Sequence, residues 1–362
     1  MARPKLSNVQ DTNPATSFPW PPASATGVGS MPGTDPVETA RVILGELLDL
    51  PHLAELPDRG PGADLTGRTA ALLIELPVEM TTSGWRFTDR PGRDMRRAQT
   101  LLAQDLDALE EAADGYQGAF KIQVCGPWTL AATIELARSQ NAALADRSAI
   151  ADLTESLAEG VANHVAEVRR RIPGARLLLQ LDEPSLTAVI EGSIPTASGF
   201  SRLPAVDAPD IETGLRTVLE AAQVPGLIHS CGMSVPFGMM KTVGADAVSF
   251  DLSQLRRGEE ETLAELVEAG LGIFVGVVPA TPGATGELPA REAVAARVVE
   301  LWRRMGWPAA RDAGGSSGIA AQVVITPACG LAGASPGYAK GALGCCREAG
   351  RLLPELIEEA TG

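Results

Sequence analysis

The sequence is poor in aromatic side chains and in positive charge. Aromatic residues make up 4% of the chain, so the core must be built mostly from Ala, Val, Leu and Ile. Lys and Arg number 30 against 45 Asp and Glu, which gives a net charge of -15. Phosphate binding needs clustered cations, so this balance argues against a nucleic-acid partner. It suits a soluble, cytoplasmic protein whose copies repel one another.

Long apolar runs and a regular cysteine framework are also lacking. No apolar run reaches the roughly 18–20 residues of a membrane span. Residues 1–26 are polar and rich in proline, and they contain no apolar stretch typical of a secretory signal. Five cysteines are widely spread, which does not indicate a disulfide framework. We therefore expect no membrane partner, and reduced thiols that bind a metal or take part in catalysis.

What the chain does contain is a regular alternation of short apolar runs and longer amphipathic runs. Before it, residues 1–25 form an extended N-terminal segment, because Pro19, Pro21 and Pro22 exclude a helix. The apolar runs predict strands at residues 26–30, 70–76, 120–125, 176–182, 226–230, 245–251, 272–278 and 321–326. The amphipathic runs predict helices at residues 36–50, 94–113, 128–138, 148–171, 211–222, 259–269, 290–305 and 337–351.

Eight strands, each followed by a helix, are typical of a single (β/α)₈ TIM-type barrel, here spanning residues 26–362. The strands are near-continuous apolar runs such as LLLQL, as expected when both faces are covered. A doubly wound open sheet is the alternative, but Gly27-Val28-Gly29-Ser30-Met31 does not continue into its phosphate-binding loop. Residues 60–67 and 311–318 are interpreted as surface loops, so no domain boundary is expected.

Residues suited to a metal site follow three of the predicted strands. His229 and Cys231 lie at the end of the fifth, Asp251 ends the sixth and Cys329 follows the eighth. The carboxyl ends of barrel strands carry the functional groups, so these side chains are expected to meet at one rim. An imidazole, two thiolates and a carboxylate favour zinc over magnesium or calcium. The sequence thus predicts a zinc site made by His229, Cys231, Asp251 and Cys329.

Each of these residues also has a purely structural explanation. A single His is more often a hydrogen-bonded core residue, and a single Cys is usually an inert buried hydrophobe. The combination of the H-x-C pair with a second Cys at the same level favours a metal. Cys125, Cys345 and Cys346 are assigned to packing, and His52 and His164, which lie in helical patterns, are given no role.

Polar residues at the ends of the first, second and fourth strands are candidates for substrate binding. Asp182 and Glu183 follow the fourth strand, where Asp182 could receive an ammonium group and a rim salt bridge is the alternative. Gly29 and Ser30 end the first strand, where an amide and a hydroxyl could hold a carboxylate, although a simple turn explains them equally well. Glu79 follows the second strand, where the residue pattern alone favours a solvated loop charge over a binding role.

Six short motifs carry a resemblance to a known family. They are VGSMPGTD ending at Asp35, CGPWTLA from Cys125, LDEPSL from Leu181, HSC from His229, AVSFD ending at Asp251, and PACGLA from Pro327. With these motifs in this order, the chain resembles the C-terminal catalytic barrel of cobalamin-independent methionine synthase, one of the zinc-dependent thiol alkyltransferases.

This resemblance implies a (β/α)₈ barrel whose zinc is held by His229, Cys231, Asp251 and Cys329. The family usually has Glu where Asp251 stands, so Asp251 is a shortened ligand. The resemblance also implies that Ser30 and Asp182 hold the amino-acid end of homocysteine, and Glu79 corresponds loosely to the family's second-strand glutamate. Zinc would favour the thiolate of homocysteine or a related small thiol, which then attacks a methyl or alkyl carbon.

Three departures concern the methyl donor. The family's N-terminal barrel, which helps bind polyglutamylated methylfolate, is missing. Val277 stands where the family has a catalytic histidine, and valine cannot transfer a proton. The polar run around the last zinc cysteine is reduced to Ala328 and to Ala332-Gly333-Ala334. We therefore expect a donor other than polyglutamylated folate, such as a methylcorrinoid protein.

The sequence is compatible with two other functions. One is a barrel related to uroporphyrinogen decarboxylase, an enzyme that needs no metal. The other is a non-catalytic zinc-binding or homocysteine-binding barrel, which the valine at position 277 would allow.

Overall fold

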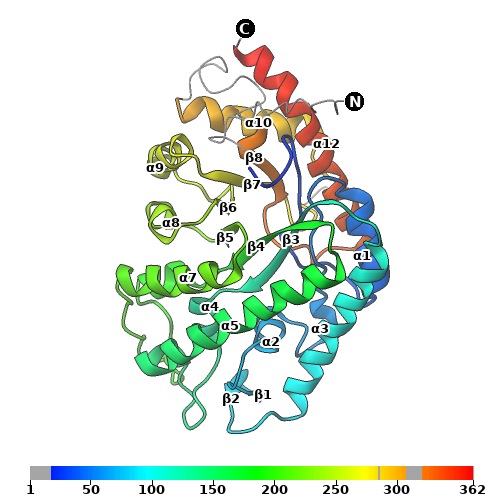
Figure 1. Ribbon diagram of the computed structural model, residues 1–362. Helices are drawn as coiled ribbons and strands as arrows, with labels where there is room; N and C mark the ends of the chain where they lie inside the picture. Colours follow the sequence, from blue (N-terminus) through cyan, green and yellow to red (C-terminus); the bar gives the residue numbers. More distant parts are fainter. Residues whose placement is uncertain (1–17, 284–285, 307–319, 362) are drawn as a thin grey trace, which may run out of the picture.

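A parallel six-stranded sheet lies at the centre of the computed structural model, which describes residues 18–283, 286–306 and 320–361 (Figure 1). The strands follow one another in sequence order, and each pairs with the next in parallel. They are β3 (Gly118–Cys125), β4 (Ala175–Asp182), β5 (Gly226–Ser230), β6 (Ala247–Asp251), β7 (Gly272–Val278) and β8 (Val323–Pro327). Parallel neighbours need crossover connections, and most of these are helical.

Helices surround this sheet, with α1 and α12 along one side and α7, α8 and α9 along another (Figure 1). The first helix begins as predicted, because the Asp35 carboxylate accepts hydrogen bonds from the amides of Val37 and Glu38. The helices are α1 (Pro36–Glu46), α2 (Leu65–Ala70), α3 (Arg93–Ala112), α4 (Pro127–Thr133), α5 (Arg147–Arg171), α6 (Leu186–Ile190), α7 (Ala208–Ala222), α8 (Phe237–Val243), α9 (Arg257–Glu268), α10 (Arg291–Arg304) and α12 (Pro336–Thr361), with short 3₁₀ turns η1 (Pro57–Arg59) and η2 (Ala143–Ala145).

Two short extended segments lie between β8 and β3. The first segment, residues 25–30, bridges β8 through Ala25 and Ile325, and the second segment, residues 51–55, bridges β3 through His52 and Lys121. The two segments bridge one another through Ser30 and Glu55. All three bridges are isolated and parallel. The predicted α/β class with a parallel sheet is confirmed, and regular strands form six of its eight predicted positions in the described part of the chain.

The prediction of a strand at residues 70–76 is wrong. Residue 70 ends helix α2, and a turn follows in which Glu75 has a φ of 57°. Short apolar runs do not distinguish a buried strand from a buried helix, which explains the error. The second position of the sheet is taken instead by the second segment, so His52 does not lie in a helix as its pattern suggested. Residues 78–87 form a separate antiparallel hairpin of β1 (Val78–Met80) and β2 (Trp85–Phe87).

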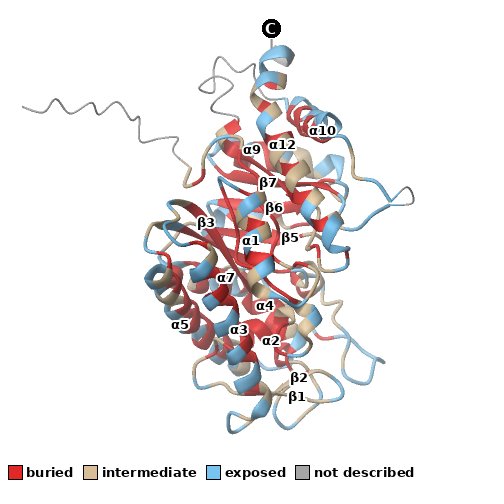
Figure 2. Ribbon diagram, turned by 90° about the vertical axis from the view of Figure 1, so that its right-hand side faces the viewer, coloured by how far each residue is buried: buried red, intermediate tan, exposed pale blue. Residues whose placement is uncertain are grey.

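The buried core has two parts. The larger part lies between the sheet and its helices, so most residues of strands β3–β8 are buried (Figure 2). The smaller part gathers residues near the amino ends of the strands, namely Trp20, Leu50, Ala119, Leu178, Leu227, Ala247, Phe274 and Val324. Trp20 packs edge-on against Phe274 with ring centroids 5.0 Å apart, and its indole N–H donates to the carbonyl of Ala321.

The position of Trp20 shows that residues 18–25 of the predicted extended segment pack against the sheet. Residues 1–17 of that segment and the predicted loop 311–318 lie outside the described residues. The predicted loop 60–67 contains the start of α2 at Leu65. None of the described helices is long and apolar enough to cross a membrane.

Candidate metal and substrate site

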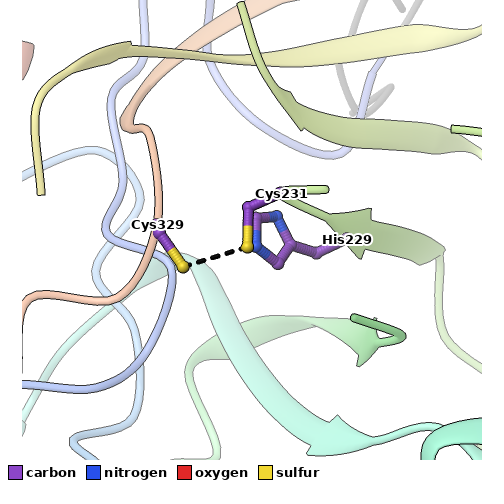
Figure 3. Close-up of side chains that lie close together, drawn as sticks. All are labelled: His229, Cys231 and Cys329. Carbon is purple, nitrogen blue, oxygen red and sulfur yellow. Dashed lines mark hydrogen bonds between the residues drawn. The ribbon is translucent and has the colours of Figure 1, made fainter. Parts of the chain in front are cut away.

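Three of the four predicted metal ligands meet beyond the carboxyl ends of β5 and β8. His229 lies on β5, Cys231 follows that strand, and Cys329 follows β8 (Figure 3). One donor atom of each lies within 4.8 Å of the other two. The two sulfur atoms face one another at 3.0 Å. The local reason is the two-residue strand period, which sends His229 and Cys231 to the same side.

The His229 ring is oriented for metal binding. It is buried, and its Nδ1 lies 2.9 Å from the hydroxyl of Ser249 on the neighbouring strand β6. Its Nε2 is buried and has no hydrogen-bond partner in the described part of the chain. Buried nitrogen atoms rarely lack a partner, and an unpaired Nε2 that faces two sulfurs fits a coordinating atom.

The pKa values of the two thiols are shifted in opposite directions. The pKa of Cys329 is lowered to about 4, mainly by the hydrogen bond from Cys231 and also by His229. The same sulfur–sulfur hydrogen bond raises the pKa of Cys231. Cys329 is therefore ready to act as a thiolate, the form that binds a metal. One nitrogen and two sulfur donors suit zinc, copper(I) or iron better than magnesium or calcium.

Asp251 lies outside this cluster. It ends β6 and is half-buried, and its Oδ1 accepts a hydrogen bond of 2.8 Å from the amide of Ser253. A turn directly after a strand is a common setting for such a bond. The role of Asp251 as the fourth ligand stays a prediction.

A cavity of about 230 Å³ opens beside the cluster. Cys231, Cys329 and His229 form one wall of it. The others are formed by Val28, Ser30, Glu55, Pro57, Ala63, Leu65, Asp182, Pro184 and Gly330. Ser30 fits closely against position 330, because a Cβ there would lie 2.0 Å from the Ser30 hydroxyl oxygen. The glycine that follows Cys329 thus leaves room for the Ser30 side chain at the cavity wall.

Two buried carboxylates, Glu55 and Asp182, line the side of the cavity formed by the second segment and β4. Burial raises the pKa of Glu55, and burial together with Glu55 raises the pKa of Asp182. The buried ammonium of Lys121 acts against both shifts, and burial lowers its own pKa to about 8. Acidic side chains are almost never buried without partners. Here Gln180 donates a hydrogen bond to Asp182, and Nε of Arg68 lies 3.7 Å from the Glu55 carboxylate.

Sequence reasoning missed Glu55. It lies in the run LPHLAEL at residues 50–56, where it and His52 are the only polar side chains. A carboxylate inside an otherwise apolar run is a signal that could have been recognised. The helix predicted at residues 36–50 reaches the start of this run, whereas α1 ends at Glu46.

The other predicted substrate-binding residues are not part of the cavity wall. Glu79 lies on the β1–β2 hairpin, where its half-exposed carboxylate pairs with Arg86 at 2.8 Å. Gly29 accepts a hydrogen bond from the amide of Glu55. Asp182 and Ser30 do line the cavity, as described above.

Two further residues singled out in the sequence, Glu183 and Val277, lie in the buried interior and bond to neighbouring helices. Glu183 is fully buried and accepts hydrogen bonds from the amides of Trp128 and Thr129 and from the Thr129 hydroxyl, at the start of α4. Val277 is buried at an irregularity of the β7–β8 pairing, and its carbonyl accepts a hydrogen bond from Arg297. Val277 does not line the cavity described above.

The catalytic-domain model of the cobalamin-independent synthase family matches residues 121–351. The chain therefore belongs to this family. No curated protein matches the sequence. The family match and the cysteine-containing cluster argue against the decarboxylase-like alternative. The family's description as cobalamin-independent does not support the methylcorrinoid donor protein that the sequence suggested.

Among solved structures, the chain is similar to a B12-independent methionine synthase from Shewanella sp. W3-18-1, solved in complex with selenomethionine. The TM-score is 0.58 at 12% sequence identity, and the match covers 93% of this chain and 99% of that one. At this identity the likeness concerns the fold alone. A carboxyl transferase domain of Rhizobium etli pyruvate carboxylase reaches a TM-score of 0.27 at 11% identity, over 70% of this chain and 43% of that one, and supports no argument.

Proposed function

We propose that the chain is a zinc-dependent methyltransferase that transfers a methyl group to homocysteine or a related small thiol. The observation behind this proposal is that a cluster able to bind a metal and a pair of buried carboxylates line the same cavity. A cluster of one imidazole and two thiols forms one wall of a cavity whose other side holds two buried carboxylates. A thiol with an ammonium group at its far end matches both walls.

The residues that would hold zinc are His229 through Nε2, Cys231 and Cys329, with Asp251 as the proposed fourth ligand. The unpaired Nε2 and the lowered pKa of Cys329 fit this assignment. Bound zinc would favour the thiolate form of a substrate thiol at neutral pH.

Recognition of the amino-acid end is assigned to the opposite wall. Asp182 and Glu55 would receive the ammonium group, and the Ser30 hydroxyl would donate to the carboxylate. Glu55 thereby takes the place that the resemblance gave loosely to Glu79. We further infer that the first and second segments complete an eight-stranded barrel with β3–β8. This closure would put Ser30 and Glu55 on the same rim as the metal ligands.

The methyl donor is proposed to be a molecule other than polyglutamylated folate. The cavity, at about 230 Å³, is smaller than the pockets of roughly 300–1,000 Å³ that hold drug-sized ligands. It suits a small thiol alone. Val277 supplies no titratable group that could protonate a folate leaving group.

The test begins with the metal content of protein purified without added metal. We expect close to one zinc per chain in the wild type and in Cys345→Ser, a control in which a half-buried cysteine of α12 is changed. Cys329→Ser is expected to lose most of its zinc, because a hydroxyl is a poor ligand for this ion. A wild type without zinc would contradict the proposal.

Methyl transfer is then measured with L-homocysteine and a panel of donors that includes methyltetrahydrofolate and its polyglutamates. We expect homocysteine to increase the sulfur ligation seen in the zinc-edge X-ray absorption spectrum. Turnover that depends on polyglutamylated folate would refute the donor argument. Zinc and homocysteine binding without turnover on any donor would instead favour the non-catalytic alternative.

A further inference from the structure

A lysine is fully buried beneath the cavity. Lys121 lies on β3 and has no exposed surface, although lysine is among the residues least often buried. Its ammonium donates a hydrogen bond of 2.8 Å to the carbonyl of Val28 and a longer one of 3.4 Å to the side chain of Gln123. Val28 belongs to the first segment, so a side chain of β3 holds the backbone of a neighbouring segment directly.

Two buried glutamines extend this arrangement. Gln180 on β4 donates to the carbonyl of Val28 at 2.9 Å and to the carboxylate of Asp182 at 2.7 Å. Gln123 donates to the carbonyl of Leu53 in the second segment at 2.6 Å. Lys121, Gln123 and Gln180, here called the polar layer, therefore connect the regular sheet to both short segments and to Asp182.

The backbone of the first segment lies directly against the polar layer. A Cβ at Gly29 would come within 2.9 Å of Gln123, and a Cβ at Gly27 within 2.3 Å of His52. Real Cβ atoms do not approach other atoms this closely. The absence of a side chain at Gly29 thus allows the first segment to approach the polar layer, and Gly27 allows it to approach His52 of the second segment.

We propose that the polar layer, with Lys121 at its centre, positions Ser30, Glu55 and Asp182 as the receptor for the amino-acid end of the substrate. The inference rests on the proposed function, because it assigns this receptor to homocysteine. The polar layer reaches the three residues by different routes. Gln180 holds Asp182 directly. The polar layer also binds the carbonyl of Val28, two residues before Ser30, and the carbonyl of Leu53, two residues before Glu55.

Lys121 also offsets the repulsion between two carboxylates that share one cavity wall. Two buried acidic groups destabilise one another unless a cation lies nearby. Lys121 is therefore a positioning residue that acts through other groups, since it does not line the cavity. A purely structural role would affect all ligands of the cavity equally, and this difference makes the inference testable.

The experiment compares zinc-loaded wild type with Lys121→Met and Lys121→Gln. Calorimetry measures the binding of L-homocysteine and of 1-propanethiol, which has the same thiol but neither the carboxylate nor the amino group. In both variants we expect homocysteine affinity to fall by about tenfold or more, because contacts to charged groups are weakened. The affinity for 1-propanethiol is expected to change by less than about twofold, since it makes no contact with the receptor and contacts to its thiol are unaffected.

Matched controls separate the outcomes. Lys241→Met removes an exposed lysine of α8 and is expected to change neither affinity. Should Lys121→Met fail to fold, Gln180→Met tests the same receptor, since it removes the contacts to Val28 and Asp182 without removing a charge. Equal losses for both thiols, or no loss for either, would overturn the inference. A wild type that binds zinc but not homocysteine would instead contradict the proposed function.

Discussion

The regular sheet and the two short segments beside it make different contributions to the site. The cluster of His229, Cys231 and Cys329 lies at the carboxyl ends of β5 and β8. A continuous ladder of main-chain hydrogen bonds from β3 to β8 holds these strands in register. The first and second segments carry Ser30 and Glu55 and are joined by isolated bridges. A few main-chain hydrogen bonds connect them to β8, to β3 and to one another. Side chains of other elements add to this support, namely the polar layer and a buried ion network behind Glu55.

The difference teaches where single substitutions should act. A strand inside a ladder keeps its place when one side chain changes, because its main-chain bonds persist. A segment with only a few main-chain bonds relies in part on side chains, so it loses part of its support when one of these is substituted. Substitutions near the short segments should therefore affect stability and substrate recognition, while those near the cluster should affect metal binding.

The largest effect is expected for Asp105→Asn. Asp105 lies on α3 with no exposed side-chain surface, and it binds Arg59 at 2.6 Å and also Arg68, whose Nε lies 3.7 Å from the Glu55 carboxylate. Losing its charge leaves two buried cations without their main partner. We expect the free energy of unfolding to fall by about 3–5 kcal/mol in urea titrations.

Asp107→Asn is the matched control on the same helix. Asp107 is 67% exposed where it pairs with Arg171, and such pairs contribute about 0–1 kcal/mol. Equal losses in the two variants would show that the ion network behind Glu55 does not support the second segment more than a surface pair would.

The next effect concerns acid stability and compares a histidine of the second segment with one on a helix outside both regions. Burial lowers the pKa of His52, on the second segment, and of His164, on α5, to about 3 each. Both stay neutral in the folded state, whereas in the unfolded chain they take up a proton below about pH 6.5. Their contribution to stability is therefore complete above pH 6.5 and is lost as the pH falls towards 3.

Between pH 7 and pH 5, each histidine should cost about 2 kcal/mol of unfolding free energy. His52→Gln and His164→Gln should each reduce the loss seen in the wild type by about that amount, measured by urea unfolding at both pH values. A His52→Gln variant with the wild-type slope would mean that the second segment opens in solution and lets His52 titrate normally.

The same contrast explains what the sequence could predict. Strands β5 and β7 have the predicted bounds, because each is a short apolar run that begins at a glycine, Gly226 or Gly272. The second segment was missed because the run LPHLAEL is interrupted by polar residues that face the interior. Its polar partners, such as Lys121, lie far away in sequence, so no local pattern indicates that they are satisfied.

The candidate site divides in the same way. His229, Cys231 and Cys329 could be brought together from strand-end positions alone, because the ends of parallel strands meet at one edge. The direction of Asp251 depends on the turn that follows β6, and local geometry of that kind does not follow from residue spacing. Glu55 replaces Glu79 at the cavity because the second sheet position was assigned to the wrong run of residues.

The smallest effect on stability, and the sharpest on the regular half of the site, is expected for Ser249→Ala. The Ser249 hydroxyl holds Nδ1 of His229 and leaves Nε2 facing the two sulfurs. Without it the ring can rotate, so zinc affinity measured by competition with a chelator should fall about 10–100-fold. The free energy of unfolding should fall by about 1 kcal/mol.

Ser253→Ala is the control, because Ser253 is exposed and its amide still binds Asp251. When both are saturated with zinc, Ser249→Ala and the wild type should bind homocysteine equally well, since the receptor on the short segments is unchanged. Unaltered zinc affinity would contradict coordination through Nε2, and weaker homocysteine binding at full zinc occupancy would contradict the separation between the two regions.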